Sequence, residues 1–348
     1  MATTPVSIGL DIGSHAVRAV EVARTKDRQV IDAFGETSLP DGATKHGVVQ
    51  DQRAVTGAVR ELWSGKRFRA KSVRLGVTHQ QVVVREVEIT DLQPKDMRRA
   101  LPHQVRDVLP FPADQAILDF RPLGPGRKPE TVSGLLVAAP KEAIVDTVHA
   151  VEKAGLHVES VDLAGFAVLR ALAAATAGPE AVVDMGAERT LVVVHTNGVP
   201  RVVRTIPRGG DDVTAMLVNR LGVSRDEAEA HKARVGTGAF GASDGPDVAV
   251  SEVVNDALRP LVNEIRSSIS FFLSAHPDHA IGRLCLAGGG AQLPGLDDLI
   301  TRSLDLPVVH GDPFQYVTTA RHRDEADALR RFRTSSAVCV GLALGAAS

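Results

Sequence analysis

Two short segments place a glycine two positions after an aspartate, at the end of a β-rich apolar run. Asp11 and Gly13 follow the first run, and Asp184 and Gly186 follow a similar run in the middle of the chain. A glycine lets the backbone approach a ligand closely, so that successive N–H groups can point at phosphate oxygens. An aspartate at the end of a strand can hold Mg²⁺, usually through water molecules. Two such turns facing each other would bind a polyphosphate from both sides.

Further residues that could contact phosphates follow each turn: Ser14, His15 and Arg18 after the first, and Ala187, Arg189 and Thr190 after the second. One Asp-x-Gly turn has little weight alone, because ordinary hairpins contain such turns. The occurrence of the same pattern in both halves of the chain favours a binding site over two unrelated hairpins. We therefore predict Asp11 and Asp184 as the metal-binding carboxylates.

Two glycine-rich segments could hold the rest of a nucleotide. The first follows an apolar strand pattern and consists of Gly288, Gly289, Gly290 and Ala291. Such a segment lets a flat base or a ribose lie against the backbone, although a plain strand-to-helix turn has the same composition. The second comprises Gly209, Gly210 and Asp211, which precede a predicted helix whose N-terminus could face a phosphate or ribose.

Other nucleotide and metal motifs are absent or misplaced. Residues 236–241 match G-x-G-x-x-G, but they follow a helical pattern, whereas the dinucleotide fingerprint needs a strand before the turn. The sequence contains no P-loop and no zinc-type spacing. The two cysteines, Cys285 and Cys339, each lie in an apolar run, which excludes a disulfide scaffold and fits a reducing compartment.

Composition disfavours nucleic acid and membrane-spanning functions. The 348 residues carry a formal net charge of −2 and only 3% aromatic residues, so neither a basic patch nor a base-stacking surface is indicated. The longest apolar stretch, 337–347, is shorter than the roughly 20 residues that a membrane-spanning helix needs. We expect any membrane contact to be made through a partner.

The elements that must position these residues form two similar halves. Each half opens with three strand patterns in which the first turn carries Asp-x-Gly, and Asn197 and Gly198 give the second half a hairpin signal. Between the halves, strand patterns at 72–78, 81–89, 117–123 and 132–139 combine with helical patterns at 94–109 and 141–154. Ser224 and Glu227 form a capping box that begins the helix carrying Glu229 and Lys232.

These residues resemble the actin-like ATPase superfamily. The first turn resembles its first phosphate motif, the second turn through Thr190 its second phosphate motif, and residues 287–291 its adenosine motif. The stretch from Gly209 through Thr214, followed by Glu229 and Lys232, resembles the segment that borders the nucleotide. The resemblance implies an α/β fold with two lobes, each an RNase H-like half, that bind ATP and Mg²⁺ between them.

Within this superfamily the chain resembles the PilM family of type IV pilus assembly proteins, which is related to the division protein FtsA. The run 109–120, Leu-Pro-Phe-Pro-Ala-Asp-Gln-Ala-Ile-Leu-Asp-Phe, is similar to a signature of that family, and the insertion lies in the first half, where the family carries an SHS2-type subdomain 1C. An amphipathic tail of the FtsA type is not expected after the last helical pattern. The resemblance implies a cytoplasmic protein held at the inner membrane by the short N-terminal tail of a bitopic PilN-like protein. That tail is expected in a groove between subdomains 1A and 1C, near residues 82–119.

The resemblance also predicts the domain boundaries. Subdomain 1A is expected over 1–75 and the inserted subdomain 1C over 76–160. A connecting helix of subdomain 1A is expected over 161–180, the second lobe over 181–330, and a helix returning to subdomain 1A over 331–348.

Two departures from the pattern predict weak turnover. His15 stands where relatives usually have a small hydroxyl residue, and Asp162 is the one acid near the position where active relatives place a water-orienting glutamate. Asp11, Asp184 and Asp162 are therefore the candidate catalytic residues, with slow or absent ATP hydrolysis expected. A small-metabolite kinase of the same superfamily, and a filament or division protein similar to FtsA or MreB, remain the alternative functions.

Overall fold

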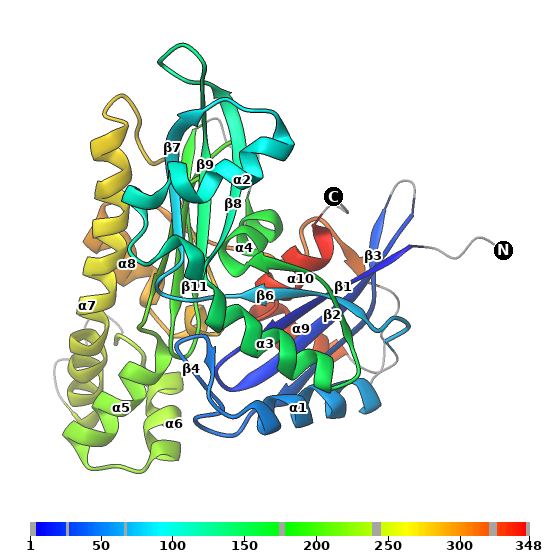
Figure 1. The fold of residues 1–348 in the computed structure, drawn as a ribbon. Helices are drawn as coiled ribbons and strands as arrows, with labels where there is room; N and C mark the ends of the chain where they lie inside the picture. Colours follow the sequence, from blue (N-terminus) through cyan, green and yellow to red (C-terminus); the bar gives the residue numbers. More distant parts are fainter. Residues whose placement is uncertain are drawn as a thin grey trace.

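The computed structural model describes residues 5–25, 28–65, 68–173, 178–238, 245–319 and 326–345. Within these residues the strands form a six-stranded sheet in the order β10-β6-β1-β2-β3-β16 and a five-stranded sheet in the order β13-β12-β11-β14-β15. A smaller three-stranded sheet, β7-β9-β8, and a short hairpin, β4-β5, complete the strands. Figure 1 shows the two larger sheets in separate lobes, with helices on their faces.

The six-stranded sheet organises the first lobe. Its strands are β1 (Val6–Ile12), β2 (Ala16–Arg24), β3 (Gln29–Ser38), β6 (Ser72–Val77), β10 (His157–Leu163) and β16 (Thr318–Thr319). The first three form an antiparallel meander, and β6 and β10 are added in parallel. One face is covered by α1 (Gln52–Gly65) and α3 (Lys141–Lys153). Most of β1 is buried, as expected for a central strand with helices on both faces.

The five-stranded sheet repeats this arrangement in the second lobe. Its strands are β11 (Pro179–Met185), β12 (Thr190–Thr196), β13 (Val199–Ile206), β14 (Leu284–Ala287) and β15 (Val308–His310). Its covering helices are α5 (Gly210–Leu221), α6 (Arg225–Val235), α7 (Pro246–Ala275) and α8 (Leu296–Leu304). The antiparallel meander followed by a parallel strand confirms the repeat of two halves. The capping box of Ser224 and Glu227 is also confirmed at the start of α6.

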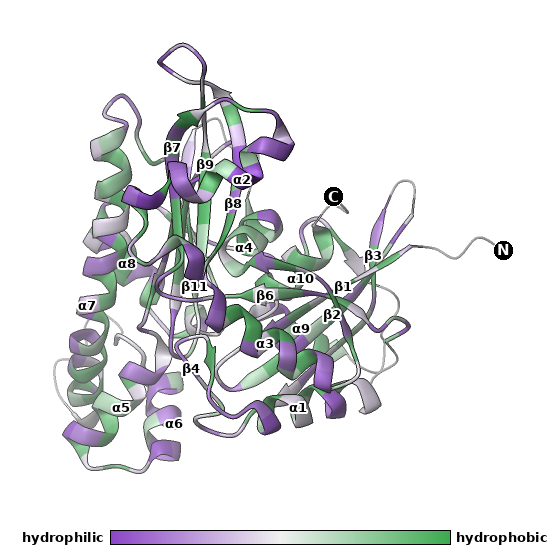
Figure 2. Cartoon of the chain, in the orientation of Figure 1, coloured by the Kyte–Doolittle hydropathy of each residue, from purple (hydrophilic) through white to green (hydrophobic). Residues whose placement is uncertain are grey.

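A shared apolar core joins the lobes. The helices α4 (Ala164–Leu172) and α10 (Ala337–Leu344) pack between the sheets, in contact with Val20 and Val22 on one side and Val182 and Val193 on the other. The remaining helix α9 (Ala326–Thr334) precedes α10, which packs against β1, β2 and α4. In Figure 2 the apolar colouring follows the central strands and α10, whereas α1, α2 and α6 carry many hydrophilic residues.

The inserted unit is a small sheet with its own core. It contains β7 (Val83–Thr90), α2 (Pro94–Gln104), β8 (Ala116–Pro125), β9 (Thr131–Pro140) and two single turns of 3₁₀-helix at Arg106–Val108 and Ala113–Gln115. Ile89, Leu101, Val132 and Leu136 are buried between α2 and the sheet. The helix predicted over 94–109 therefore ends earlier, at Gln104.

The insertion is shorter than the predicted range 76–160. The helix α3 buries Ile144 and Val151 in the core of the first lobe, and β10 pairs in parallel with β6. Neighbouring parallel strands need a crossover connection, usually a helix that covers one face of the sheet. Because α3 is that crossover, residues 141–160 belong with the six-stranded sheet, and the insertion occupies the first part of the connection.

The G-x-G-x-x-G match at 236–241 lies partly outside the described residues. Gly236 ends α6 with a φ of +58°, so the G-x-G-x-x-G match begins after a helix, as the sequence indicated. No helix within the described ranges is both long enough and apolar enough to cross a membrane.

Candidate functional site

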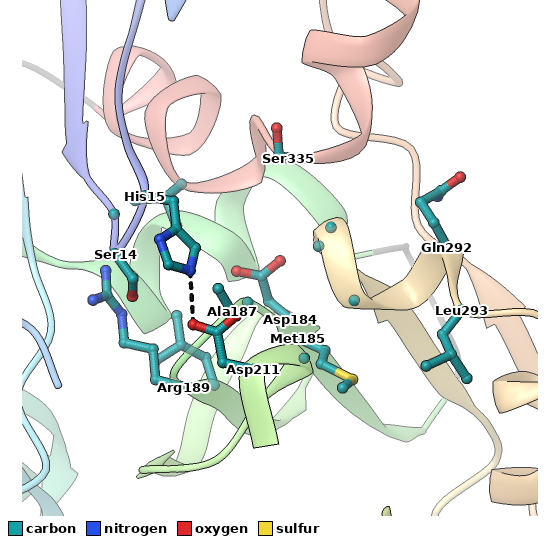
Figure 3. A pocket seen from close by; sticks show the side chains of 18 of the residues that line it. Ser14, His15, Asp184, Met185, Ala187, Arg189, Asp211, Gln292, Leu293 and Ser335 are labelled. Atoms are coloured by element: carbon teal, nitrogen blue, oxygen red, sulfur yellow. Dashed lines mark hydrogen bonds and ion pairs between the residues drawn. The ribbon is translucent and has the colours of Figure 1, made fainter. Parts of the chain in front are cut away.

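A cavity of about 630 Å³ lies between the two lobes and is lined by both Asp-x-Gly turns. Figure 3 shows His15 of the first lobe facing Asp211 of α5, with Asp184 and Arg189 of the second turn beside them. The predicted residues that line it are Asp11, Gly13, Ser14, His15, Arg18, Asp184, Gly186, Ala187, Arg189, Gly210, Asp211, Glu229, Lys232, Gly288, Gly289 and Gly290. The fold thus brings together segments more than a hundred residues apart in the sequence.

The two turns have the same hydrogen bond. The N–H of Gly13 donates to the carbonyl of Ala16 at 2.9 Å, and the N–H of Gly186 donates to the carbonyl of Arg189 at 2.8 Å. Each glycine N–H therefore closes its own turn. Backbone contacts to a phosphate must come from the residues that follow the glycines.

The start of α5 supports the second turn instead of presenting free N–H groups. The N–H of Gly210 donates to the carbonyl of Gly186 at 3.0 Å, and that of Asp211 donates to the carbonyl of Ala187 at 2.9 Å. Because these N–H groups are already used, a phosphate or ribose at this helix start would not be bound by the N–H groups of Gly210 and Asp211. What α5 brings to the cavity is the Asp211 side chain.

Four predicted residues are not among the described residues that line the cavity: Thr190, Gly209, Ala291 and Asp162. Thr190 is fully buried and donates its hydroxyl to the carbonyl of Arg208 at 2.8 Å, while Gly209 caps α5 and Ala291 is buried. Asp162 lies at the end of β10, where it forms an ion pair with Arg170 of α4 and accepts from its neighbour's N–H. The structure therefore does not support Asp162 as the water-orienting acid, because Arg170 holds its carboxylate away from the cavity.

The two aspartates of the turns are unusually hard to ionise. Burial raises the pKa of Asp11, against the opposing charges of Arg189 and Arg18. Burial, and then the charge of Asp11, raise the pKa of Asp184 to about 6. Two carboxylates that each oppose the other's charge in a desolvated site favour a cation between them. Mg²⁺ suits this donor set, since it is often held by one or two carboxylates together with water and substrate phosphates.

Arg189 supplies a hydrogen-bond donor to the same space. Its Nη2 donates to the carbonyl of Ile12 across the lobes at 3.2 Å. Its Nη1 is buried and has no hydrogen-bond partner within the described part of the chain. A buried donor left unpaired is unfavourable, so an anionic ligand that reached it would gain a charge-assisted hydrogen bond.

The glycines after β14 are required by close packing. Gly288 has a φ of +91°, and a Cβ added there would lie 2.4 Å from the Met185 carbonyl oxygen and 2.7 Å from Asp184 Oδ1. A Cβ at Gly290 would lie 2.4 Å from the Met185 side chain. Gly288 and Gly290 therefore pack directly against the second Asp-x-Gly turn, where a larger residue would not fit.

A third polar group lies where α5 and α6 meet. Lys232 Nζ lies 2.7 Å from Glu229 Oε2 and donates to Thr214 Oγ1 at 2.7 Å. Burial opposes the charge of Glu229, but the hydrogen bonds from Lys232 and Thr214 lower the pKa of its carboxyl. Glu229 therefore stays ionised, and a carboxylate beside an ammonium group suits a ligand with hydroxyl groups, such as a ribose.

Some lining residues were not found by sequence reasoning: Asp41, Thr78, Arg225, Gln292, Leu293 and Ser335. Arg225 begins the helix that follows the capping box, but its position beside Asp211 depends on the packing of α6 against α5. Ser335 lies between α9 and α10, far along the chain, and carries no local signal.

Comparisons with known proteins agree with this geometry. A model of the family "Type IV pilus assembly protein PilM" matches residues 9–347. The solved structure of a "PilM-PilN type IV pilus biogenesis complex" is similar with a TM-score of 0.84 and 27% identity, covering 98% of each chain. The cell division protein FtsA of Bacillus subtilis is 23% identical over 344 residues, which cover 86% of this chain and 77% of that protein.

The fold extends to more distant actin-like proteins. MreB5 of Spiroplasma citri bound to ADP is similar with a TM-score of 0.53 and 11% identity, covering 97% of this chain and 95% of that one. This likeness concerns the fold alone, and it confirms the predicted actin-like architecture of two lobes. Because the family model spans nearly the whole chain, this protein belongs to the type IV pilus assembly protein PilM family.

Proposed function

We propose that this protein is an ATP-binding adaptor of the type IV pilus assembly platform at the inner membrane. In this role it binds Mg²⁺-ATP between its lobes and the cytoplasmic N-terminal tail of a PilN-like membrane protein on its surface. The observation that carries the proposal is the cavity between two matching Asp-x-Gly turns, in a chain of this family. The similar solved structure, a complex of PilM with PilN, supports the choice of partner.

The residues of the cavity fit a nucleotide and a divalent cation. Asp11 and Asp184 would hold Mg²⁺, whose positive charge would offset the repulsion between their carboxylates. Arg189 and the backbone after Gly13 and Gly186 would donate to phosphate oxygens, because the glycine N–H groups are already used. The segment 288–290 would lie against the adenosine, and Glu229 with Lys232 would face the ribose.

Binding without efficient hydrolysis fits the distribution of acids. The carboxylates lining the cavity among the described residues are those of Asp11, Asp41, Asp184, Asp211 and Glu229. The first and third are assigned to the cation, and the last two form ion pairs with His15 and Lys232. Asp41 is mostly exposed and lies 3.6 Å from the second ring nitrogen of His15, and Asp162 is bound to Arg170, so none of these acids is left to orient water beside the terminal phosphate. ATP then acts as a structural or regulatory ligand.

Two exposed sheet edges offer a place for the partner tail. The strand β8 is the edge of the inserted sheet, with Ile117 and Leu123 exposed by 42% and 38%. The strand β10 is the edge of the six-stranded sheet, with Val161 exposed by 37%. Unpaired edges with apolar side chains are suited to an extended peptide. These edges belong to the two subdomains between which the tail is expected, which supports a protein held at the cytoplasmic face of the membrane through its partner.

The division-protein alternative rests on the 23% identity to FtsA. It predicts sedimentation that depends on protein concentration and ATP, which an adaptor does not need. The metabolite-kinase alternative predicts phosphoryl transfer to a small hydroxyl compound.

Calorimetry tests both halves of the proposal. ATP with Mg²⁺ is titrated into the wild type, into Asp11→Ala, and into Asp278→Ala, whose exposed aspartate lies after α7 and serves as the matched control. A synthetic peptide of the partner tail is then titrated with and without ATP. We expect the wild type and the control to bind ATP, Asp11→Ala to lose it, and all three to bind the peptide.

Separate outcomes would refute separate parts. If the folded wild type, freed of nucleotide, binds no ATP, the nucleotide function is wrong. If ATP binds but the peptide does not, the nucleotide site stands and the adaptor role fails.

A further inference from the structure

One side-chain contact crosses the cavity between the two lobes. His15 follows the first Asp-x-Gly turn, and Asp211 lies in the first turn of α5 in the second lobe. His15 Nε2 lies 2.7 Å from Asp211 Oδ2. Figure 3 shows this bond as the dashed line from the His15 ring to the Asp211 carboxylate, beside the second turn. Since a carboxylate accepts, the ring N–H is the donor, and both partners line the space assigned to the nucleotide.

Asp211 would keep a cationic partner if its hydrogen bond with His15 were broken. Arg225 Nη2 lies 3.3 Å from the other carboxylate oxygen of Asp211, so this carboxylate keeps a cationic partner without His15. The second ring nitrogen of His15 lies 3.6 Å from Asp41, a mostly exposed acid. The His15 ring thus lies between two acids that line the cavity, and a polyphosphate placed there would compete with Asp211 for the ring N–H.

Other contacts hold the turns together when this one opens. Arg189 reaches the carbonyl of Ile12 across the lobes, and the N–H of His46 donates to Glu188 Oε2 at 3.1 Å. His46 belongs to the turn between β4 (Thr44–Lys45) and β5 (Val48–Val49). Opening of the contact between His15 and Asp211 would therefore free the His15 ring inside the cavity without separating the lobes.

We propose that His15 and Asp211 form a latch that is closed in the nucleotide-free protein and is released by the phosphates of a bound nucleotide. The inference rests on the proposed function and adds a regulation to that site. The closed latch opposes nucleotide binding, because His15 must leave Asp211 and because the Asp211 carboxylate repels phosphate. On release, the ring N–H of His15 donates to a phosphate of the ligand and no longer to Asp211 of the second lobe. The contact between His15 and Asp211 therefore depends on whether phosphate is bound.

A double-mutant cycle in binding affinity tests the latch. ATP with Mg²⁺ is titrated into the wild type, Asp211→Asn, His15→Ala and the double variant. The Asp211→Asn variant keeps the shape of the side chain and removes its charge, so we expect about tenfold tighter ATP binding, equivalent to about 1.4 kcal/mol. In the His15→Ala background the same substitution should change ATP affinity by less than about threefold, the part due to repulsion alone.

Binding of adenosine distinguishes a latch that responds to phosphate from a direct contact between Asp211 and the ribose. Adenosine lacks phosphates, so it should leave the latch closed and bind wild type and Asp211→Asn with affinities equal within about twofold, measured by competition with a fluorescent ATP analogue. A matched control cycle uses Arg220 and Asp256, an ion pair of 2.6 Å within the second lobe, and should show no coupling in ATP affinity. If His15→Ala fails to fold, His15→Asn replaces it, because it keeps a polar side chain at the turn.

The outcomes separate this inference from the proposed function. Weaker ATP binding by Asp211→Asn, or an equal gain with and without His15, overturns the latch while nucleotide binding stands. An adenosine affinity that changes with Asp211→Asn assigns the carboxylate to the ribose and also overturns it. A wild type that binds no nucleotide refutes the proposed function, and the latch falls with it.

Discussion

The carboxylate of Asp184 lowers the stability of the nucleotide-free protein, so we expect its position to serve ligand binding. The pKa of its carboxyl rises from 3.8 to about 6, first because of burial and then because of the charge of Asp11. Each pKa unit corresponds to about 1.4 kcal/mol, so the ionised carboxylate destabilises the nucleotide-free fold by about 3 kcal/mol. The Asp184→Asn variant removes this charge with little change in shape. We therefore expect it to be more stable than the wild type at neutral pH and to lose Mg²⁺-ATP.

The pH dependence follows from the direction of the shift. The folded protein binds the Asp184 proton more tightly than the unfolded chain, so the penalty is absent below a pH of 3.8, grows as the pH rises toward about 6, and is complete above it. The gain in melting temperature of Asp184→Asn over wild type should grow across that window and stay constant above it. Saturating Mg²⁺-ATP should then raise the melting temperature of the wild type and leave that of the variant unchanged.

The assay is thermal unfolding of nucleotide-free protein between about pH 4 and about pH 8, a range that includes the expected titration. Asp278→Asn, an exposed aspartate after α7, is the control and should show no difference that depends on pH. A variant at position 184 that is less stable than wild type at pH 8, or whose difference is the same at all pH values, would refute the reasoning. In that case burial does not oppose the charge of Asp184, and the argument for a cation between the aspartates fails.

Further predictions concern other parts of the molecule. Gly288→Ala should lower stability by about 2 kcal/mol or more and weaken ATP binding, because the added Cβ meets the Met185 carbonyl and a φ of +91° is strained; unchanged melting and affinity would contradict the packing. Ile117→Asp should weaken binding of the partner tail at least tenfold, about 1.4 kcal/mol, without changing ATP affinity, whereas Phe271→Asp, 63% exposed on α7, should change neither. The hydrogen bond with Asp211 raises the pKa of His15. The contribution of protonated His15 to stability should therefore be complete below a pH of 6.5 and lost as the pH rises through the raised pKa. The difference in melting temperature between wild type and His15→Ala should shrink accordingly, with Asp41, Asp211 and Arg225 as the charged groups around the ring, and a constant difference would contradict this. Steady-state ATP hydrolysis should be far slower than the ~1–100 s⁻¹ of kinases, and a rate within that range would show that an acid does orient water.

Local patterns made much of the fold and the site predictable. The Asp-x-Gly turns, the glycines after β14 and the capping box of α6 are each set by a few adjacent residues, and the repeat in two halves placed the turns on equivalent strands. A turn that needs glycine, or a cap that needs serine and glutamate, is decided by backbone geometry and is visible without the rest of the chain. Most of the residues assigned from these patterns therefore meet in the cavity, with Thr190, Gly209 and Ala291 as the exceptions.

Contacts between distant segments were decided by the tertiary structure alone. The position of α3 follows from the parallel pairing of β10 with β6, which the helical pattern itself does not encode. The sequence predicted Asp162 as the acid that orients water, but its side chain forms an ion pair with Arg170 because α4 packs between the sheets. The contact between His15 and Asp211 joins residues 196 positions apart. Local sequence determined which turns and caps form, whereas the packing of the two lobes decided which charges face each other, because electrostatic contacts depend on distance in space and not along the chain.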